Sequence, residues 1–592
     1  MASDQALHNV TRRKRNDTAS PRLRFAAVVV FFVGGLIISR LFTLMILQHS
    51  FYTALAAGSH EVYAQLFPVR GEIFVQDSRT GEEYPLAINR DYFLIYADTR
   101  LILDDEMAEN VAEKLAEVFE YNDEKKLEVF LQVNKRTDPY EPLEMKVDQE
   151  VVDKLTELDL PGINYIRQSH RFYPENNLAS HVVGFVGKTE DGQNIGRYGV
   201  EGYWQDELAG SGGFYEGMKS ATGLWIPLAG KNLESAKDGV DILLTIDRTL
   251  QFKACQKLNF AAIEYGAVSA SLVILDPWTG AIRTMCGFPD FDPNDYSQVE
   301  SGEVYNNNSI FMSYEPGSIF KPVVMAAALN EGVVTPNTWF TDTGIRDDIC
   351  DTPIRNAESK IFGNQTMTGV LENSINTGMV FVAEQLGKKK LINYIEDFGF
   401  GLKEGIELDS ENSGTIDTLS INRGDNVDCY SATASFGQGI TATPLQLVTA
   451  FGAIANGGTL LKPYIVEEIR YADGKVDRFG KKEVRQVIQK KSANLLGGML
   501  VTVVDSGHAT GAGVEGYYVA GKTGTAQIAG SGGYTDATNQ SFVGFAPVDN
   551  AKFVMIVKFE KPKRAYSATT AAPVFGDIAS FVLQYYQVPP GR

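Results

Sequence analysis

Histidine is scarce in this chain of 592 residues, which has only six. No Gly-x-Ser-x-Gly motif occurs, so the sequence does not indicate a hydrolase of the Ser-His-Asp type. It also lacks His-Glu-x-x-His or a comparable group of ligands, which removes the case for metal catalysis. His508 is the histidine nearest to the motifs described below. It lies in a glycine-rich segment before Lys522 and is interpreted as a loop residue.

Positive charge is also limited, because 54 lysines and arginines face 74 aspartates and glutamates and leave a net charge of −20. No basic stripe follows the first 24 residues, and we therefore expect no nucleic-acid partner. The acidity is interpreted as a solvated surface. An apolar share of 44% and a charged share of 22% are ordinary for a globular protein. At roughly 150 residues per domain, the length predicts two to four domains.

Cysteine is limited to four residues, and none of them forms a Cys-x-x-Cys pair. Three disulfide pairings of Cys255, Cys286, Cys350 and Cys429 are possible. The strand-like surroundings of Cys286 suit a buried thiol as readily as a bridge. If a bridge exists, we expect it between Cys350 and Cys429, which both lie in loop-like acidic stretches.

The N-terminal part contains an apolar run over residues 25–47, interrupted by only three polar residues. At 1.5 Å per residue, this run is long enough to cross a hydrocarbon core of about 30 Å. Basic residues precede it, whereas the first charged residue after it is Glu61. The positive-inside rule predicts a cytoplasmic tail over residues 1–24, a membrane anchor over 25–47 and an external remainder. A cleaved signal peptide is the alternative, because residues 54–56 read Ala-Leu-Ala.

Residues 50–240 mix short predicted strands and helices without a catalytic-looking cluster, and we interpret them as a non-catalytic pedestal. Within them, residues 90–97 are predicted as a strand and residues 105–119 as an amphipathic helix. Residues 210–213 are glycine-rich and are predicted to form a turn, with phosphate binding as a remote alternative.

Residues 241–592 differ from residues 50–240 in their pattern of predicted strands and helices. Strand-like runs over residues 268–286 and 541–559 flank this part, each with a predicted helix beside it. They predict one antiparallel sheet covered by helices, whereas residues 300–500 are mostly helical and predict a second lobe. The fold class is therefore α/β (α+β), with a site expected in the cleft between the two lobes.

The first of three short motifs is a serine three residues before a lysine, Ser318 and Lys321. Ser318 is predicted to open a helix that runs to about Asn330, so that the hydroxyl and the amine share a face. Ser318 is the expected nucleophile and Lys321 the expected base. The amine must be neutral to accept a proton. We expect burial, neighbouring cations and the helix N-terminus to lower its pKa, and the N–H of Ser318 to face a developing oxyanion.

The second motif is a Ser-x-Asn pair formed by Ser374 and Asn376, at the start of an apolar helical run. Ser374 is expected to relay a proton to the leaving amine and Asn376 to donate to the substrate's amide. A helix cap is the alternative interpretation of Ser374. A second copy of the motif at Ser420 and Asn422 lies in a polar, loop-like stretch and is interpreted as a chance match.

The third motif comprises Lys522, Thr523, Gly524 and Thr525, in a strand predicted to include residues 517–519. Gly524 removes a side chain so that a peptide can lie against the strand edge. Lys522 and the two threonine hydroxyls suit a substrate carboxylate, and the N–H of Thr525 could complete an oxyanion hole.

Residues 516–523 also fit the P-loop pattern Gly-x-x-x-x-Gly-Lys-Thr, which makes an NTPase the rival enzyme class. A P-loop needs a strand before its first glycine and a helix after its lysine. Here glycines precede and follow the segment, and the residues between are bulky. We therefore reject this alternative.

Two longer segments carry a family resemblance, residues 314–322 (Tyr-Glu-Pro-Gly-Ser-Ile-Phe-Lys-Pro) and 519–527 (Val-Ala-Gly-Lys-Thr-Gly-Thr-Ala-Gln). Shorter matches lie at residues 70–73, 199–203 and 436–439. On these motifs the chain resembles the class B penicillin-binding proteins over nearly its whole length.

The resemblance implies a catalytic domain like that of the serine D,D-peptidases and β-lactamases over residues 241–592. A pedestal or dimerisation-like domain is implied over residues 50–240. The implied reaction is transpeptidation, in which Ser318 attacks the penultimate D-Ala of a peptidoglycan stem peptide, expels D-Ala and passes the acyl group to an acceptor amine. β-Lactams acylate the same serine, and no cofactor is needed.

The resemblance also implies partners in a bacterial cell membrane, with a single-pass anchor and an external catalytic domain. Family members work beside a multi-spanning SEDS-family glycosyltransferase, and Arg40 in the anchor could contact it or reach the outer interface. Residues 315–317 and 96–98 resemble the septal branch, which predicts divisome partners. An elongation-type enzyme, or a non-catalytic β-lactam sensor or glycosyltransferase activator, is the alternative.

Overall fold

A computed structural model of the protein describes Gly34 and the ranges 61–66, 68–190, 192–218, 232–421, 424–530 and 533–592. The anchor predicted over residues 25–47 lies outside these residues, apart from Gly34. Within the described ranges, no helix combines the length and the apolar character that a bilayer crossing requires.

The chain divides into two compact units. The smaller unit, Met1–Phe67 with Gly212–Ala236, contains an antiparallel sheet in the order β1-β8-β9. Its strands are β1 (Glu61–Leu66), β8 (Gly213–Met218) and β9 (Asn232–Glu234). The larger unit, Pro68–Ser211 with Lys237–Arg592, contains all three sequence motifs.

A mixed sheet of seven strands combines segments of the predicted pedestal with segments of the predicted catalytic part. Its order is β19-β18-β10-β2-β3-β4, with β5 also paired to β3. Only the pairing of β2 with β10 is parallel. The strands are β2 (Ile73–Gln76), β3 (Glu83–Ala97), β4 (Glu141–Val147), β5 (Ile163–Phe172), β10 (Asp241–Asp247), β18 (Val466–Arg470) and β19 (Val476–Arg478).

The pedestal has a small hydrophobic core of its own, formed by helices packed on β3 and β4. The helix predicted over residues 105–119 is observed with the same bounds, and the strand predicted over residues 90–97 is the second half of β3. The turn predicted over residues 210–213 is wrong, because Ser211 forms a β-bridge with Lys237 and Gly213 begins β8; only Gly210, with a φ of +69°, has left-handed backbone. The helices and short strands here are α3 (Asp105–Phe119), α4 (Asp123–Val133), α5 (Gln149–Glu157), α6 (Ser180–Val183), β6 (Phe185–Lys188), β7 (Asn194–Arg197), α7 (Gly199–Tyr203) and α8 (Gln205–Ala209).

The predicted antiparallel sheet of the catalytic part is confirmed and has five strands in the order β12-β11-β23-β22-β21. Strands from both ends of this part meet at its centre, where β11 pairs with β23. The strands are β11 (Ser269–Leu275), β12 (Ile282–Phe288), β21 (Ala520–Gly530), β22 (Gly533–Ala546) and β23 (Phe553–Glu560).

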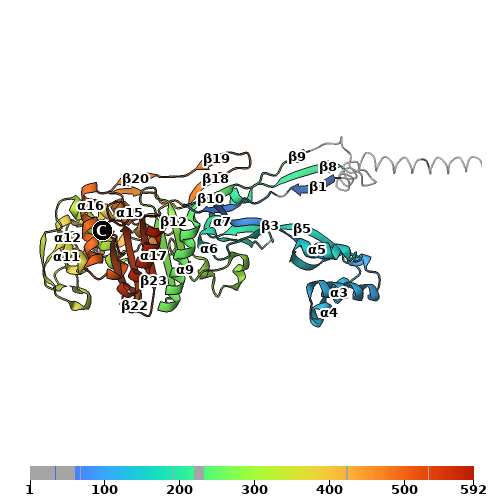
Figure 1. Ribbon diagram of the computed structural model, residues 1–592, viewed down its shortest axis with the longest axis horizontal. Helices are drawn as coiled ribbons and strands as arrows, with labels where there is room; N and C mark the ends of the chain where they lie inside the picture. Colours follow the sequence, from blue (N-terminus) through green and yellow to red (C-terminus); the bar gives the residue numbers. More distant parts are fainter. Residues whose placement is uncertain are drawn as a thin grey trace, which may run out of the picture. The chain divides into compact units, whose positions relative to one another are not determined.

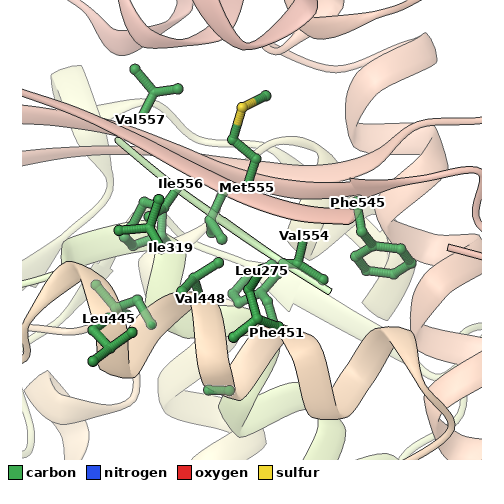
Figure 2. Close-up of a cluster of buried hydrophobic side chains, with 14 of the residues drawn as sticks. Leu275, Ile319, Leu445, Val448, Phe451, Phe545, Val554, Met555, Ile556 and Val557 are labelled. Carbon is green, nitrogen blue, oxygen red and sulfur yellow. The ribbon is translucent and has the colours of Figure 1, made fainter. Parts of the chain in front are cut away.

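Helices cover both faces of this sheet (Figure 1). On one face, α9 (Arg248–Tyr265) and α17 (Ala571–Tyr585) pack against it through ring contacts such as Phe542 with Phe575. On the other face lies α15 (Pro444–Ala455), whose Val448 and Phe451 face Val554 and Ile556 of β23 (Figure 2). The main hydrophobic core therefore fills the space between the sheet and the helical lobe.

The helical lobe surrounds α15 and contains the first two motifs. Residues 339–366 form two short antiparallel strand pairs within it, one nested inside the other, so this region is less helical than the sequence predicts. The helices are η5 (Gly317–Phe320), α10 (Lys321–Asn330), α11 (Met367–Glu372), α12 (Asn376–Leu386), α13 (Lys388–Asp397), α14 (Cys429–Ala434) and α16 (Lys490–Asp505). The paired strands are β13 (Trp339–Asp342), β14 (Ile345–Arg346), β15 (Ile354–Arg355) and β16 (Gly363–Thr366).

All four cysteines form disulfides. The predicted bridge between Cys350 and Cys429 is confirmed and joins the region of the two strand pairs to α14. Cys286 is buried, but it is bonded to Cys255 and is not a free thiol. The bridge between Cys255 and Cys286 forms because α9 packs on β12 and brings Cys255 over Cys286.

Glu201 is fully buried in the pedestal and pairs with two arginines. Arg70 Nη2 donates to Glu201 Oε2 at 2.5 Å, and Arg171 Nε donates to Oε1 at 2.6 Å. Burial alone would raise the pKa of Glu201, but the two guanidinium groups outweigh it and hold this pKa below its usual value. The triad joins the motifs at residues 70–73 and 199–203, which are distant in sequence.

We predict that Glu201→Ala lowers the free energy of unfolding by about 3–5 kcal/mol, because it leaves two arginines without their shared counter-charge. Urea unfolding followed by circular dichroism measures this change. Glu207→Ala on α8 is the matched control, since Glu207 is exposed, and it should stay within about 0.5 kcal/mol of the wild type. Equal effects of both substitutions would contradict the structural role of the triad.

Candidate active site

Ser318 lies in a tight turn that leads into a buried helix. The predicted helix is present, but its first turn is the 3-10 helix η5, followed by α10. Gly317 has a φ of +57° and donates its N–H to the carbonyl of Gly437 at 2.9 Å. A Cβ on Gly437 would lie 2.3 Å from the Gly317 oxygen, so only glycine allows this approach. Ser318 is partly exposed, while Ile319 beside it is buried.

Lys321 is fully buried directly after this turn. Its Nζ donates to the Ser374 carbonyl at 2.6 Å and to Asn376 Oδ1 at 2.8 Å, and lies 3.2 Å from Ser374 Oγ. A neutral amine has two N–H groups and one lone pair. The carbonyl and the amide oxygen can accept both N–H groups, which leaves the lone pair for a hydroxyl proton.

Ser374 lies between α11 and α12 in a left-handed conformation, with a φ of 56°. The residue that caps α12 is Ile375, and no side chain caps this helix, so the helix-cap interpretation of Ser374 is wrong. Strained backbone at a non-glycine residue clusters at functional sites. Asn376 opens α12, accepts from Lys321 through Oδ1 and donates through Nδ2 to the Arg355 carbonyl at 2.9 Å.

A buried network that the sequence analysis missed holds Asn376 in place. Asn356 Oδ1 accepts from the backbone N–H groups of Asn376 and Thr377 at 3.0 and 3.2 Å. Asp342 in turn accepts from Asn356 Nδ2 and from Thr377 Oγ1 at 2.6 Å. Burial opposes the charge on Asp342, but these hydrogen bonds outweigh it and lower its pKa. No short motif marks these residues, because their partners are distant in sequence.

Lys522 lies on β21, the edge strand of the five-stranded sheet, and is 1% exposed. Gly524 faces the nucleophile turn, since a Cβ there would lie 2.9 Å from Ile319 Cγ2. Thr523 Oγ1 is 3.4 Å from Lys522 Nζ. The Thr525 hydroxyl instead contacts Ser567 Oγ at 3.0 Å, a partner that the sequence did not indicate. The free edge of β21 can accept an additional extended segment.

Strand β21 begins at Ala520, so the prediction of a strand over residues 517–519 is wrong. Gly516 has a φ of +85°, and the Tyr517 N–H donates to the Val514 carbonyl at 3.1 Å, which closes a turn just before the segment, while residues 518–519 have no regular structure. Because a strand and not a helix follows Lys522, the segment also lacks the geometry of a P-loop.

Both buried lysines have lowered pKa values, and the charge of Lys522 contributes to the shift at Lys321. Burial, and then the positive charge of Lys522, hold the pKa of Lys321 well below its usual value. Burial lowers the pKa of Lys522 to about 7. The expected causes at Lys321, burial and a neighbouring cation, are therefore both present. Such an amine can accept a proton at neutral pH.

The structure brings the three motifs together. Lys321 contacts Ser374 and Asn376 directly, and Gly524 packs on the turn that carries Ser318. Ser420 ends a short 3-10 helix (Asp417–Ser420) and is exposed, whereas Asn422 lies outside the described residues. His508 lies in a turn after α16, as predicted. The described residues contain no group of three or more His, Cys, Asp or Glu that could hold a metal ion.

One further residue near the nucleophile escaped the sequence analysis. Glu315 Oε1 accepts the Gly439 N–H at 2.9 Å, and Oε2 accepts the Tyr534 hydroxyl at 2.8 Å. Through Glu315, the segment before Ser318 is tied to the start of β22. Residues 314–317 and 436–439 both belong to segments that resemble the family. This shared resemblance could have suggested that their glycines and Glu315 support one turn.

Two family models match this chain. "Penicillin binding protein transpeptidase domain" matches residues 270–580, and "Penicillin-binding Protein dimerisation domain" matches residues 65–244. Because the first covers more than half of the chain, the chain belongs to the penicillin-binding protein transpeptidase family. The predicted resemblance to class B members is confirmed by these matches and the relatives below.

Individual proteins agree with this assignment. The stage V sporulation protein D of Bacillus subtilis is 34% identical over 98% of this chain and 88% of its own length. The peptidoglycan D,D-transpeptidase FtsI of Buchnera aphidicola is 30% identical over 75% of each chain. The crystal structure of penicillin binding protein 2X from Streptococcus thermophilus has the same fold, with a TM-score of 0.74 at 22% identity, over 89% of this chain and 81% of that one.

We predict that Lys522→Met flattens the dependence of stability on pH. With a folded pKa of about 7 against a usual 10.5, the folded chain binds fewer protons than the unfolded chain between these values. Stability therefore rises with pH across this window. Removing the amine removes up to ~1.4 kcal/mol per pH unit from that slope. Urea unfolding at several pH values from about 7 to 10 measures it.

Lys552→Met, at an exposed lysine, is the control for this measurement. The two substitutions remove the same charge from different environments. Identical slopes for wild type and Lys522→Met would show that Lys522 does not titrate in this window.

Proposed function

We propose that this transpeptidase cross-links peptidoglycan through an acyl-enzyme on Ser318. The observation that carries the proposal is the buried amine of Lys321, which follows Ser318 by one turn and contacts Ser374 and Asn376. Burial and the charge of Lys522 hold the pKa of this amine well below its usual value. The name of the Buchnera relative, a peptidoglycan D,D-transpeptidase, supports the choice of substrate.

Acylation begins when Lys321 takes the hydroxyl proton of Ser318. The serine oxygen then attacks the carbonyl carbon of the penultimate D-Ala, and the N–H groups of Ser318 and Thr525 donate hydrogen bonds to the developing oxyanion. The proton passes by way of Ser374 to the leaving D-Ala nitrogen as the peptide bond breaks. An acceptor amine then attacks the ester carbonyl, and its proton passes by way of Lys321 to the Ser318 oxygen as the ester C–O bond breaks and releases Ser318.

Substrate binding falls to β21 and Asn376. The stem peptide extends along the free edge of β21, past Gly524. Lys522, with the Thr523 hydroxyl near its amine, binds the terminal carboxylate. One N–H of Asn376 Nδ2 remains beyond its bond to Arg355 and can donate to the peptide. β-Lactams present a reactive amide and a carboxylate to the same groups, and the reaction needs no cofactor.

We predict that a fluorescent penicillin labels the protein covalently and that Ser318→Ala abolishes the label, because Ser318 is the proposed nucleophile and lies one helical turn before the buried amine of Lys321. Intact mass and peptide mapping locate the adduct. Ser420→Ala is the matched control, since Ser420 belongs to the second Ser-x-Asn copy and should leave labelling intact. Persistent labelling of Ser318→Ala would place the nucleophile elsewhere. A sensor would be labelled but would not produce cross-linked muropeptides, so an assay of these products separates the two.

The cellular setting that we propose is the outer face of a bacterial cell membrane. The apolar run over residues 25–47 serves as a single anchor with the tail inside. A SEDS-family glycosyltransferase and divisome proteins are the proposed partners, and the septum is the proposed place of work. The septal likeness of residues 315–317 and 96–98 supports this role. The name of the Bacillus relative favours a second candidate, peptidoglycan synthesis during sporulation.

We predict that a fluorescent fusion of the full chain concentrates at the division site in growing cells. Time-lapse microscopy measures the signal at the septum relative to the side wall. A uniform side-wall signal would favour the elongation role, and a signal restricted to sporulating cells would favour the second candidate. Cells that carry the Ser318→Ala fusion control for effects of activity on placement.

A further inference from the structure

Lys558 on β23 is a buried cation that the reaction above does not use. Its side chain is 3% exposed, and its Nζ lies 4.6 Å from the centroid of the Tyr314 ring. Among the described residues, no carboxylate lies within ion-pair distance of this ammonium. Glu560, two residues further along the strand, acts on it at longer range and accepts a hydrogen bond from Ser269 at 2.8 Å.

The register of the sheet places Lys558 beneath the candidate active site. Lys558 pairs with Ser541, and Ser541 pairs with Gly524. Residues directly opposite one another share a face, so these three form a row that spans two strand spacings, or roughly 10 Å. A Cβ on Gly524 would lie 2.9 Å from both Ser541 Oγ and Ile319 Cγ2. One end of this row therefore touches the turn that carries Ser318.

The hydroxyl groups around this row are poorly satisfied. Ser271 Oγ is buried and makes no hydrogen bond within the described part of the chain, whereas the buried hydroxyls of Tyr314 and Ser541 interact only with each other. Ser271 pairs with Lys558 and extends the row onto β11. Protein cores normally satisfy such groups, and an ammonium without a counter-ion is expensive to bury. Burial lowers the pKa of Lys558 to about 8, with Glu560 opposing it, so the amine is mostly charged at neutral pH.

Tyr314 connects this cation to the nucleophile. It lies four residues before Ser318, and its N–H and carbonyl pair with Ala442 at 3.0 and 2.9 Å. Its ring is held from the sheet side by the ammonium of Lys558. A cation over an aromatic face is attractive, and more so when both groups are removed from water. The buried charge of Lys558 is destabilising, but it contacts Tyr314 and so supports the segment that contains Ser318.

We propose that Lys558 is a positioning residue for the acylation of Ser318: its ammonium fixes Tyr314 and the following turn, and supplies positive charge behind the position of the oxyanion. Both effects favour the transition state over the bound ligand. The inference rests on the proposed role of Ser318 as nucleophile.

The test is Lys558→Met, which keeps the length of the side chain and removes its charge. Acylation of the full chain by a fluorescent penicillin is resolved into the non-covalent dissociation constant and the acylation rate constant. We expect the rate constant to fall about tenfold, as for a unit charge acting across roughly 10 Å of partly buried protein. The dissociation constant should be unchanged, and the midpoint of thermal unfolding should equal or exceed that of the wild type, since an unpaired buried charge is removed.

Two further variants sharpen the result. Lys552→Met, at the exposed lysine just before β23, should leave acylation unchanged. Tyr314→Leu should reproduce the loss of Lys558→Met, and the double variant should lose little more, because both act through one contact.

Two outcomes for Lys558→Met would overturn the inference. One is a wild-type acylation rate constant. The other is a fall in the rate constant with a matching fall in the unfolding midpoint, which would make Lys558 a support of the core alone. A wild-type protein without an adduct on Ser318 would instead refute the proposed function, and the inference with it.

Discussion

The chemistry proposed for this protein depends on an amine whose pKa the fold holds well below its usual value. Lys321 is completely enclosed, and its Nζ is surrounded by oxygen atoms of Ser374 and Asn376. Burial and the charge of Lys522 both disfavour a proton on it. The oxygen acceptors alone would favour the protonated amine and raise the pKa of Lys321. The exclusion of water has the larger effect and lowers this pKa. Every element that excludes water from Lys321 therefore supports its proposed role as the base, including α10, α12 and the edge strand β21.

The precision of the site comes from close backbone contacts and buried polar groups outside the motifs. Gly437 and Gly524 let the nucleophile turn pack against its neighbours with no side chain between them. The Asp342–Asn356–Thr377 network fixes the start of α12, and with it Asn376. Left-handed backbone at Ser374 is tolerated because Lys321 and α11 hold it from both sides.

The sequence-based predictions succeeded where one continuous segment contains all the residues that define the feature. The helix over residues 105–119 and the strand β23 follow from periodicity and flanking turns, and the Ser-x-x-Lys and Lys-Thr-Gly motifs are contiguous. Features that depend on register were not predictable. The bridge between Cys255 and Cys286 requires α9 to lie on β12, and Lys558 looks like an ordinary strand residue until its row across the sheet is known. Residues 517–519 are bulky and are therefore predicted as a strand, but a turn with left-handed Gly516 ends at Tyr517, and strand β21 begins only at Ala520.

The mixed sheet has a practical consequence for dissecting the molecule. Strand β10 hydrogen-bonds to β18 on one side and, in parallel, to β2 on the other. A fragment starting at residue 241 would keep β10 but lose β2, and would expose a row of unpaired amide and carbonyl groups along an apolar strand. Such an edge recruits strands from other molecules. A soluble catalytic fragment must therefore carry the β2–β3 hairpin with it, even though neither strand touches the nucleophile.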